Sequence, residues 1–546
     1  MKCEALTTSK LTSKGIVEFD LTLSNLHFTN SNKKDIMIVS KKIQTSILLC
    51  CMLGLFSCSK AHFAELNVNP DQSATAPPYL LLPNISVKSF TLVTPDHGNA
   101  ALRSHQAGDC QQPYTEQYWN WLQGDYSTYN ILLQVHQMKL EAANYKQPAY
   151  AAIAQFFDAY NFYKTTMLFG DVPFSQAEQG GTGVYNPVYD NQKAVFLGIL
   201  KELDSANTSL IPFSSGQGIL TGDIIYGNSA NELLQWRKLI NSFTLRVLIT
   251  LSNKTADPDL QVIPRFQKIY NDPTTYPIFQ SNADNGALTY SNQNGNIYPL
   301  YKNTEVTRLY PDSAFCTFLT TNKDPRLFAY FSQTANSVTA GKQATDFSAY
   351  KGIDASIITT TAANIFTQTG TISGLNIRYT ANPAPEPYVG VGYPELEFNL
   401  AEAAFRGWIT GNPETFYKNG IQASFSFYEP YENLPAGTYQ TATYFPTYYA
   451  NPAIAYNPAT GLQQIIYQKY VASFYNSFEE PYFNMRRTGF PGVTVNGGGM
   501  QNNGKLPLRF RYPIAETQTN ATALNAAIQG QFPTGDDING IMWLLK

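Results

Sequence analysis

The chain has 546 residues and a formal net charge of −3, with 37 basic and 40 acidic side chains. This balance offers nothing to attract nucleic acid, so nucleic acid is not expected as a partner. The length allows a large buried core, and the six cysteines are too few to suggest a framework of disulfides.

An export signal is predicted near the N-terminus. Residues 37–57 contain Lys41 and Lys42, then a mostly apolar run, then Ser57 directly before Cys58. This order is that of a secretory signal, and a cysteine at the cleavage point is typical of bacterial lipoproteins. The apolar run is too short for a membrane-spanning helix of about 20 residues. We therefore expect cleavage before Cys58 and a lipid anchor, such as palmitate, on that residue. The alternative is a cleaved secretory peptide with an incidental cysteine.

The segments on either side of this signal are expected to lack regular structure. Residues 1–36 are polar and precede the internal Met37, which indicates a translation start placed too far upstream. Residues 58–112 contain turn-forming and proline-rich stretches, so we expect a tether and an irregular segment there. After cleavage, Cys110 and Cys316 remain, either paired or as free buried thiols.

Most of the remaining chain is predicted to be helical, from apolar residues at helical spacing with prolines early and glycines late. The expected helices cover about 113–122, 148–168, 190–209, 231–252, 259–270, 312–321, 394–408, 413–428, 462–474, 477–485 and 522–529. Consecutive helices joined by loops predict antiparallel pairs. Residues from about 272 to 390 are rich in Asn, Gly, Thr, Ser and Tyr, which predicts a loop-rich region with short strands.

Acidic residues on the predicted 394–408 helix are interpreted as structural. Glu395 and Glu397 are two residues apart and so face different ways, while Glu402 lies four residues before Arg406 in the favourable orientation for an ion pair. A glycosidase needs two carboxylates about 5 to 9.5 Å apart across a cleft, which a sequence does not show. The paired arginines at 486–487 are expected to complement a helix dipole and bridge to neighbours.

No metal, cofactor or catalytic residue is predicted. The four histidines after Cys58 include no His-x-x-x-His pair, and no paired cysteines accompany them. Neither a Gly-x-Ser-x-Gly elbow nor a phosphate-binding Gly-x-x-x-x-Gly-Lys loop occurs. We therefore expect a protein that is not an enzyme.

Aromatic residues near loops are the best candidates for ligand contacts. A sugar ring packs its C–H groups on a flat aromatic face while its hydroxyl groups reach amides and carboxylates. Two stretches combine these residue types. The candidates are Tyr118, Trp119, Asn120, Trp121, Asp125 and Tyr126 in the first, and Asn296, Tyr298 and Tyr301, together with Tyr290, Asn292 and Asn294, in the second. The alternative for both stretches is that the aromatic rings pack in the core.

Motifs spread over the chain after Cys58 resemble the SusD/RagB family of nutrient-binding outer-membrane lipoproteins, in its SusD-like branch. No single motif is decisive, but their joint order is specific. The motifs are LNVNP at 66–70, PPYLLLP at 77–83, LFGDVPFS at 168–175, GDIIY at 222–226, WRKL at 236–239, LR at 245–246, YPELEF at 393–398, AEAA at 401–404, NMRRTGFP at 484–491 and RYP at 511–513.

The resemblance implies a mostly α fold in which tetratricopeptide-like helix pairs pack with the loop-rich region. It implies that residues 113–546 form one large helical domain with the insertion at about 272–390. The implied partner is a SusC-like TonB-dependent barrel transporter, to which the protein delivers oligosaccharide. Two alternatives remain: a peptide or other nutrient as the ligand, and, less favoured, a surface glycosidase.

The resemblance also implies a lipid-anchored protein of the outer membrane that faces the cell exterior. Surface lipoproteins of this type often carry acidic residues just after the lipidated cysteine. Here Cys58 is followed by Ser59, Lys60, Ala61 and His62 instead, so the sequence leaves the face of the membrane open.

Overall fold

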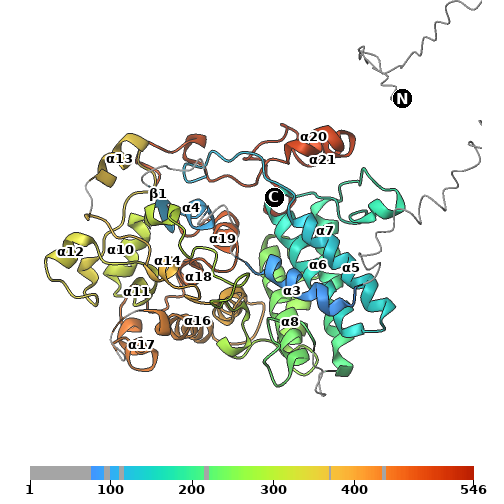
Figure 1. The fold of residues 1–546 in the computed structure, drawn as a ribbon, viewed down its shortest axis with the longest axis horizontal. Coiled ribbons are helices and arrows are strands. Elements are labelled where there is room, and N and C mark those ends of the chain that lie inside the picture. Colours follow the sequence, from blue (N-terminus) through green and yellow to red (C-terminus); the bar gives the residue numbers. More distant parts are fainter. Residues whose placement is uncertain are drawn as a thin grey trace, which may run out of the picture. The chain divides into compact units, whose positions relative to one another are not determined.

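The computed structural model describes residues 76–91, 99–109, 116–213, 220–367, 370–432, 434 and 438–546. The predicted signal, Cys58, most of the predicted tether and Cys110 lie outside these residues. The described residues belong to one compact unit, Thr75–Lys546. They are mostly helical with a few short strands (Figure 1), which confirms the predicted fold class.

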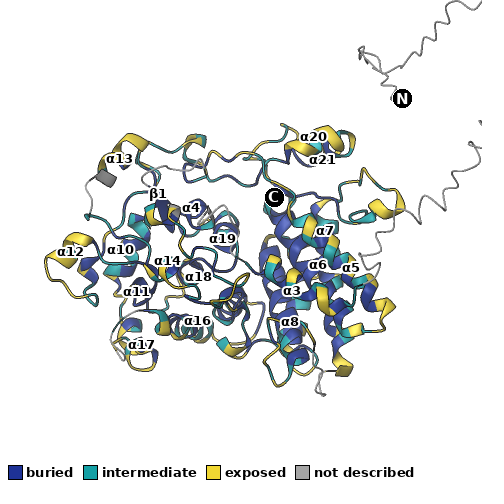
Figure 2. Cartoon of the chain, viewed as in Figure 1, coloured by how far each residue is buried: buried dark blue, intermediate teal, exposed yellow. Residues whose placement is uncertain are grey.

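The first helical block comprises α3 (Pro78–Ser89), α4 (Asn99–Arg103), α5 (Thr128–Asn144), α6 (Pro148–Phe169), α7 (Gln192–Leu210), α8 (Glu232–Thr250) and α9 (Val262–Asn271). α6 packs between α5 and α7, and α7 packs against α8. α6 is buried along most of its length (Figure 2) because apolar and aromatic residues surround its axis. Pro148 begins α6, and Gly170, with φ of 92°, ends it.

The middle of the chain holds short elements. They are β1 (Ala107–Asp109), β2 (Gly286–Leu288), β3 (Leu309–Pro311), α10 (Ser313–Thr321), α11 (Arg326–Tyr330), α12 (Ala335–Thr339), α13 (Thr359–Thr367), α14 (Arg378–Ala381) and β4 (Tyr388–Val391). The strands form two antiparallel pairs: β1 with β3, where Gly108 faces Tyr310, and β2 with β4, where Leu288 faces Tyr388.

The second helical block comprises α15 (Tyr393–Phe405), α16 (Pro413–Tyr428), α17 (Thr441–Tyr449), α18 (Gly461–Ala472), α19 (Glu480–Thr488), α20 (Ile514–Thr519) and α21 (Ala521–Gln531). Short 3-10 turns occupy Gln179–Thr182, Ile211–Phe213, Leu251–Lys254, Asn282–Asp284, Glu305–Arg308, Phe347–Ala349, Glu429–Tyr431, Asn502–Gly504 and Trp543–Leu545. α15 packs against α16, α18 and α8, so it joins the two blocks. A buried ion pair between Arg246 of α8 and Glu395 of α15 reinforces this junction.

Two expectations about local structure were wrong. The predicted helix at 113–122 is not formed by its described part, because residues 116–119 make a turn in which Trp119 has a φ of 59°. Helix α3, in contrast, lies within the stretch expected to be irregular. Pro78 occupies its first turn, and Leu82 and Ile85 are fully buried on one face, so tertiary packing stabilises it.

Within the described residues, none of the helices is both long enough and apolar enough to span a bilayer.

Candidate binding cleft

The chain between α18 and α19 is unusual because three residues that are not glycine adopt left-handed backbone conformations. Tyr475, Ser477 and Phe478 have φ values of 55°, 60° and 54°. Such conformations cost about 1 kcal/mol or more each and persist only where surrounding contacts hold them. The sequence predicted a helix from Ser477, but α19 begins at Glu480. We call residues 475–478 the strained loop.

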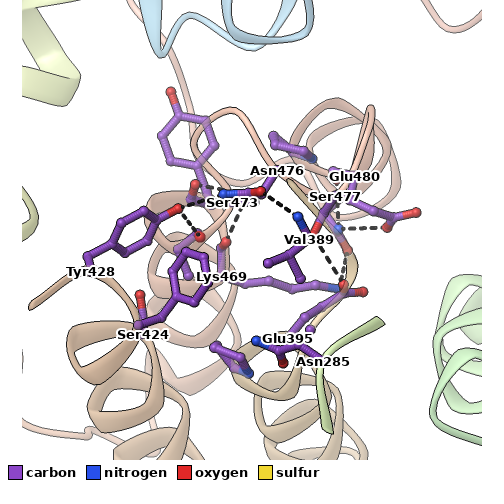
Figure 3. Close-up of a pocket in the computed structure, with 17 residues that line it drawn as sticks. Asn285, Val389, Glu395, Ser424, Tyr428, Lys469, Ser473, Asn476, Ser477 and Glu480 are labelled. Carbon is purple, nitrogen blue, oxygen red and sulfur yellow. Dashed lines mark hydrogen bonds and ion pairs between the residues drawn. The ribbon is translucent and has the colours of Figure 1, made fainter. Parts of the chain in front are cut away.

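Hydrogen bonds to β4 hold the strained loop in place. Asn476 Oδ1 accepts a hydrogen bond from Val389 N at 2.8 Å, and Ser477 N donates to Val389 O at 2.8 Å. Phe478 N donates to the hydroxyl oxygen of Tyr388 at 3.0 Å. Figure 3 shows Asn476 beside Val389, with a dashed line marking the hydrogen bond between them. β4 therefore determines which way the loop presents its aromatic rings.

The strained loop lines a cleft of about 610 Å³, which lies within the range of about 300 to 1,000 Å³ seen for small-molecule sites. The other walls come from α3, α4, α5, α6 and the segments at 116–127 and 510. The cleft is therefore built from parts of the chain that are far apart in the sequence.

The side chains of this cleft combine aromatic rings with amides. The rings belong to Phe169, Tyr388, Tyr475, Phe478 and Phe510, and the amides to Gln106, Gln123, Asn130, Gln134 and Asn476. Flat rings suit the C–H faces of a sugar, and amides suit its hydroxyl groups. Four of the five rings are buried, so Phe478, which is partly exposed, is the ring that a ligand in the cleft could contact.

Six charged residues also line the cleft. They are Lys88, Arg103, Lys164, Glu116, Asp125 and Glu479. Arg103 Nη1 and Glu479 Oε1 form an ion pair at 2.5 Å, and the Arg103 guanidinium lies over the rings of Trp121 and Phe510. Asp125 Oδ1 accepts a hydrogen bond from Ser127 N at 2.7 Å. Burial lowers the pKa of Lys164 from 10.5 to about 8.

A second, smaller cavity of about 30 Å³ lies against the other side of the strained loop (Figure 3). It shares Ser473, Asn476 and Pro481 with the cleft. Its volume fits a water molecule but not a sugar. Glu395 and Glu480, which also line this cavity, are buried.

The buried carboxylates around the small cavity are engaged in structural contacts. Burial acts to raise the pKa of Glu395, but Arg246 and Lys469 hold it below its ordinary value. Burial raises the pKa of Glu480, whose Oε1 accepts a hydrogen bond from the Tyr163 hydroxyl at 2.8 Å. These groups support the interior rather than project into the cleft.

The predicted structural roles of Glu402 and the arginine pair are confirmed. Glu402 binds Arg406 at 2.8 Å and Arg487 through two hydrogen bonds of 2.5 and 2.8 Å. Burial alone would raise the pKa of Glu402, but Arg487 and Arg406 lower it to about 2. Arg486 and Arg487 both lie in the last turn of α19. No cluster of three or more His, Cys, Asp or Glu side chains that could hold a metal ion occurs among the described residues.

Three residues of the first predicted stretch are buried. Trp119 and Trp121 are 2% and 1% exposed, and Tyr118 is 6% exposed. The indole nitrogen of Trp119 donates to Arg103 O at 3.2 Å, and that of Trp121 donates to Glu116 O at 3.0 Å. Trp121 stacks on Phe510, which lines the cleft, so Trp121 supports the cleft wall from within the core.

The other members of the first predicted stretch are more accessible. Asp125 is exposed and lines the cleft, whereas Asn120 is exposed but does not line it. Tyr126 is partly buried and packs edge-on against Phe169, another residue of the cleft lining. The first stretch and the cleft therefore meet at Asp125.

The second predicted stretch reaches this lining only through Pro299, which was not among the predicted residues. Tyr298 is 2% exposed, and its ring packs against Tyr290 and Tyr379. Asn296 donates to the Ser291 hydroxyl at 3.1 Å, and Tyr301 is partly buried beneath Lys302. None of these residues lines either cavity. Ligand binding at the residues of both stretches stays a prediction.

Sequence reasoning missed the strained loop and Lys164. Lys164 lies on the predicted 148–168 helix, and its position on an otherwise apolar surface was an available signal. The left-handed conformations at 475–478 had no such signal, because no glycine or asparagine occupies the three positions that adopt them.

Comparisons with known proteins agree with this architecture. A family model described as "Starch-binding associating with outer membrane" matches residues 73–513. A solved outer membrane protein of Bacteroides vulgatus ATCC 8482, associated with nutrient binding, is 34% identical, with a TM-score of 0.79 over 86% of this chain and 100% of that one. A SusD homologue of Bacteroides fragilis NCTC 9343 is 36% identical, with a TM-score of 0.78 over the same shares.

A chitin-binding protein shares the fold, at 22% identity and a TM-score of 0.68 over 86% of this chain and 99% of that one. No curated protein matches the sequence.

Proposed function

This chain belongs to the SusD-like family of starch-binding proteins that associate with the outer membrane, and we propose that it is a surface lipoprotein that captures oligosaccharide in the 610 Å³ cleft and delivers it to a SusC-like TonB-dependent transporter. The observation that carries the proposal is the lining of the cleft, where the partly exposed ring of Phe478 lies among amide side chains.

The strained loop supports this assignment. Its backbone energy is offset by the hydrogen bonds of Asn476 and Ser477 to Val389, so the fold maintains a costly conformation at the cleft. Rings held in advance lose little conformational entropy when a ligand binds, which favours affinity. Asp125, at the rim, is proposed as a hydrogen-bond acceptor for sugar hydroxyl groups.

A peptide or other charged nutrient is the second candidate, because six charged side chains line the cleft. A peptide would place its termini and charged side chains against these groups. We also propose that the protein does not catalyse a reaction, since Glu479 in the cleft is paired with Arg103 at 2.5 Å. A surface glycosidase would release reducing sugars from the oligosaccharide it binds, and incubation of bound glycans with the protein tests for this product.

Binding is tested with oligosaccharide and peptide arrays, followed by calorimetry on the best ligand of each class. Asn130 and Phe478 line the cleft, and neither side chain forms a hydrogen bond with another described residue that its loss would break. We expect Asn130→Ala and Phe478→Ala to weaken oligosaccharide binding by about tenfold each. Asn144→Ala is the matched control, since Asn144 lies exposed on the same helix as Asn130 but outside the cleft. Retained affinity in both cleft variants, or binding of peptides alone, would refute the proposal.

Delivery to a transporter is the part of the proposal that concerns the partner. It is tested by purifying the tagged protein from membranes of its own host under mild detergent. Recovery of a TonB-dependent barrel in a constant ratio is the expected result. Recovery of the lipoprotein alone, with the barrel present in the same extract, would contradict the partnership.

A further inference from the structure

Lys164 is a buried cation that lines the cleft. It lies on α6 and is 6% exposed. Within the described part of the chain, Nζ donates one long hydrogen bond, to Ser89 O at 3.4 Å. Its other close neighbours are the rings of Phe478 and Tyr160, whose centroids lie 4.5 and 5.4 Å from Nζ. No carboxylate within the described residues forms an ion pair with it.

Several other buried cations among the described residues are paired with carboxylates. Arg246 binds Glu395, Arg326 binds Asp324, Arg378 binds Glu386 and Arg487 binds Glu402. Pairing is expected because an isolated buried charge is strongly unfavourable. Lys164 has no carboxylate partner of this kind among the described residues. It lies instead at the wall of a cleft that is large enough for a ligand.

The carboxylates that line the same cleft do not serve as its partner. Glu479 is paired with Arg103, Asp125 accepts the Ser127 amide, and Glu116 has an interaction of its own. Lys88, on α3, adds a second cation to the lining, and its side chain is exposed. An anion that entered the cleft could therefore contact two lysines. Neither lysine would have to give up an ion pair with a described residue.

We propose that Lys164 and Lys88 form an anion subsite in the cleft, so that the preferred ligand is an acidic oligosaccharide carrying a carboxylate or sulfate group. This inference rests on the proposed function and names its substrate class. Nζ of Lys164 is 4.5 Å from the centroid of the Phe478 ring. A sugar ring in contact with Phe478 would bring an acidic substituent within reach of that ammonium group.

Burial supports this assignment energetically. With its pKa lowered to about 8, Lys164 is still mostly protonated at neutral pH, but its charge is poorly solvated. An anionic group supplies the missing partner, and hydrogen bonds to charged groups are stronger than those between neutral groups.

The test compares pairs of oligosaccharides that differ only in charge. Uronic acid oligosaccharides are paired with their methyl esters, and sulfated oligosaccharides with the unsulfated parents, on the full chain purified in detergent. We expect the wild-type protein to bind the anionic member of at least one pair about tenfold more tightly or better. Which type of pair shows the preference distinguishes a carboxylate from a sulfate ligand.

Lys164→Met should remove this preference, so that the charged and the neutral member of a pair bind with equal affinity. Lys201→Met is the control for net charge, because Lys201 is exposed on α7 outside the cleft, and it should keep the preference. A melting temperature at or above that of the wild type shows that Lys164→Met is folded.

The outcomes separate the two proposals. Equal affinity for charged and neutral members in the wild type, or a preference that survives Lys164→Met, overturns the anion subsite alone. Failure of every oligosaccharide to bind overturns the proposed function, and the anion subsite with it.

Discussion

Trp121 stacks on Phe510, with ring centroids 4.7 Å apart and ring planes inclined by 23°. Only Phe510 of this pair lines the cleft, while Trp121 is 1% exposed. Both rings are buried in the core, with Phe510 at 7% exposure, and Phe510 also forms part of the cleft wall. The cleft wall is therefore an extension of core packing.

Trp121→Ala is expected to lower the free energy of unfolding by about 3 to 5 kcal/mol, because it leaves a cavity behind Phe510. Chemical denaturation measures this change. Leu122→Ala is the neighbouring control: Leu122 is 54% exposed, so a change within about 0.5 kcal/mol is expected. Unchanged stability of Trp121→Ala, together with lost oligosaccharide binding, would identify Trp121 as a direct ligand contact instead.

Lys164→Met is expected to stabilise the protein at pH 7. The pKa of Lys164 falls from 10.5 to about 8 on folding, and a difference of this size corresponds to about 3 kcal/mol. Between pH 8 and pH 10.5 the unfolded chain binds more protons at this site than the folded chain. The stability of the wild type should therefore rise across this interval relative to that of the variant.

Urea denaturation of both proteins at several pH values tests this expectation. The difference between the two unfolding free energies isolates Lys164, because the other titrating groups are common to both proteins. A variant with a smaller unfolding free energy than the wild type at pH 7 would contradict this expectation, because it would show that the charged side chain of Lys164 stabilises the folded protein.

Asn476→Ala is expected to loosen the strained loop. The substitution leaves Val389 N without its acceptor and removes the hydrogen bond to the Tyr428 hydroxyl, so a loss of about 1 to 3 kcal/mol is expected. Ligand affinity should fall as well, since Tyr475 and Phe478 lose their fixed positions. Asn382→Ala alters an exposed asparagine outside the lining and should leave affinity intact. Full affinity in Asn476→Ala would contradict the role of the loop.

Glu402 is expected to contribute stability that disappears in acid. Its pKa is lowered from 4.5 to about 2 by Arg487 and Arg406, against the effect of burial. A depressed carboxyl pKa stabilises the folded state above about pH 4.5, and this stabilisation is lost as the pH falls toward 2. Its size is about 3 kcal/mol.

Glu402→Gln should therefore be less stable than the wild type at pH 7, with the difference shrinking between pH 4.5 and 2. Denaturation curves over this interval measure it. Glu414→Gln is the control, since Glu414 pairs with Lys418 at the surface and contributes little. A difference that does not depend on pH would argue against the ion pair as its source.

Cys58→Ala is expected to release the protein from the membrane, because the predicted lipid anchor is then absent. Fractionation of cells and mass spectrometry of the N-terminal peptide measure the two parts of this expectation. The comparison is made in a strain without the barrel partner, so that protein contacts do not retain the variant. Membrane association of Cys58→Ala in that strain would place the anchor elsewhere.

Much of the helical architecture follows from local sequence. Helix α6 was expected at 148–168 and spans Pro148–Phe169, since proline, apolar spacing and Gly170 define its limits. The Glu402 to Arg406 ion pair was likewise predictable from a spacing of four residues. The aromatic stretch at 118–121 was not, because a dense run of rings suits a helix, a turn or a core contact equally well.

The order of the amino acids by itself determined the helical class and the family to which the chain belongs, since both depend on patterns within short segments. The cleft was decided only by tertiary structure. Arg103 meets Glu479 across 376 positions, and Asn476 meets Val389 across 87. Contacts between distant parts of the chain decide that Trp121 lies in the core and that Lys164 has no carboxylate partner among the described residues. No local sequence pattern predicts such contacts.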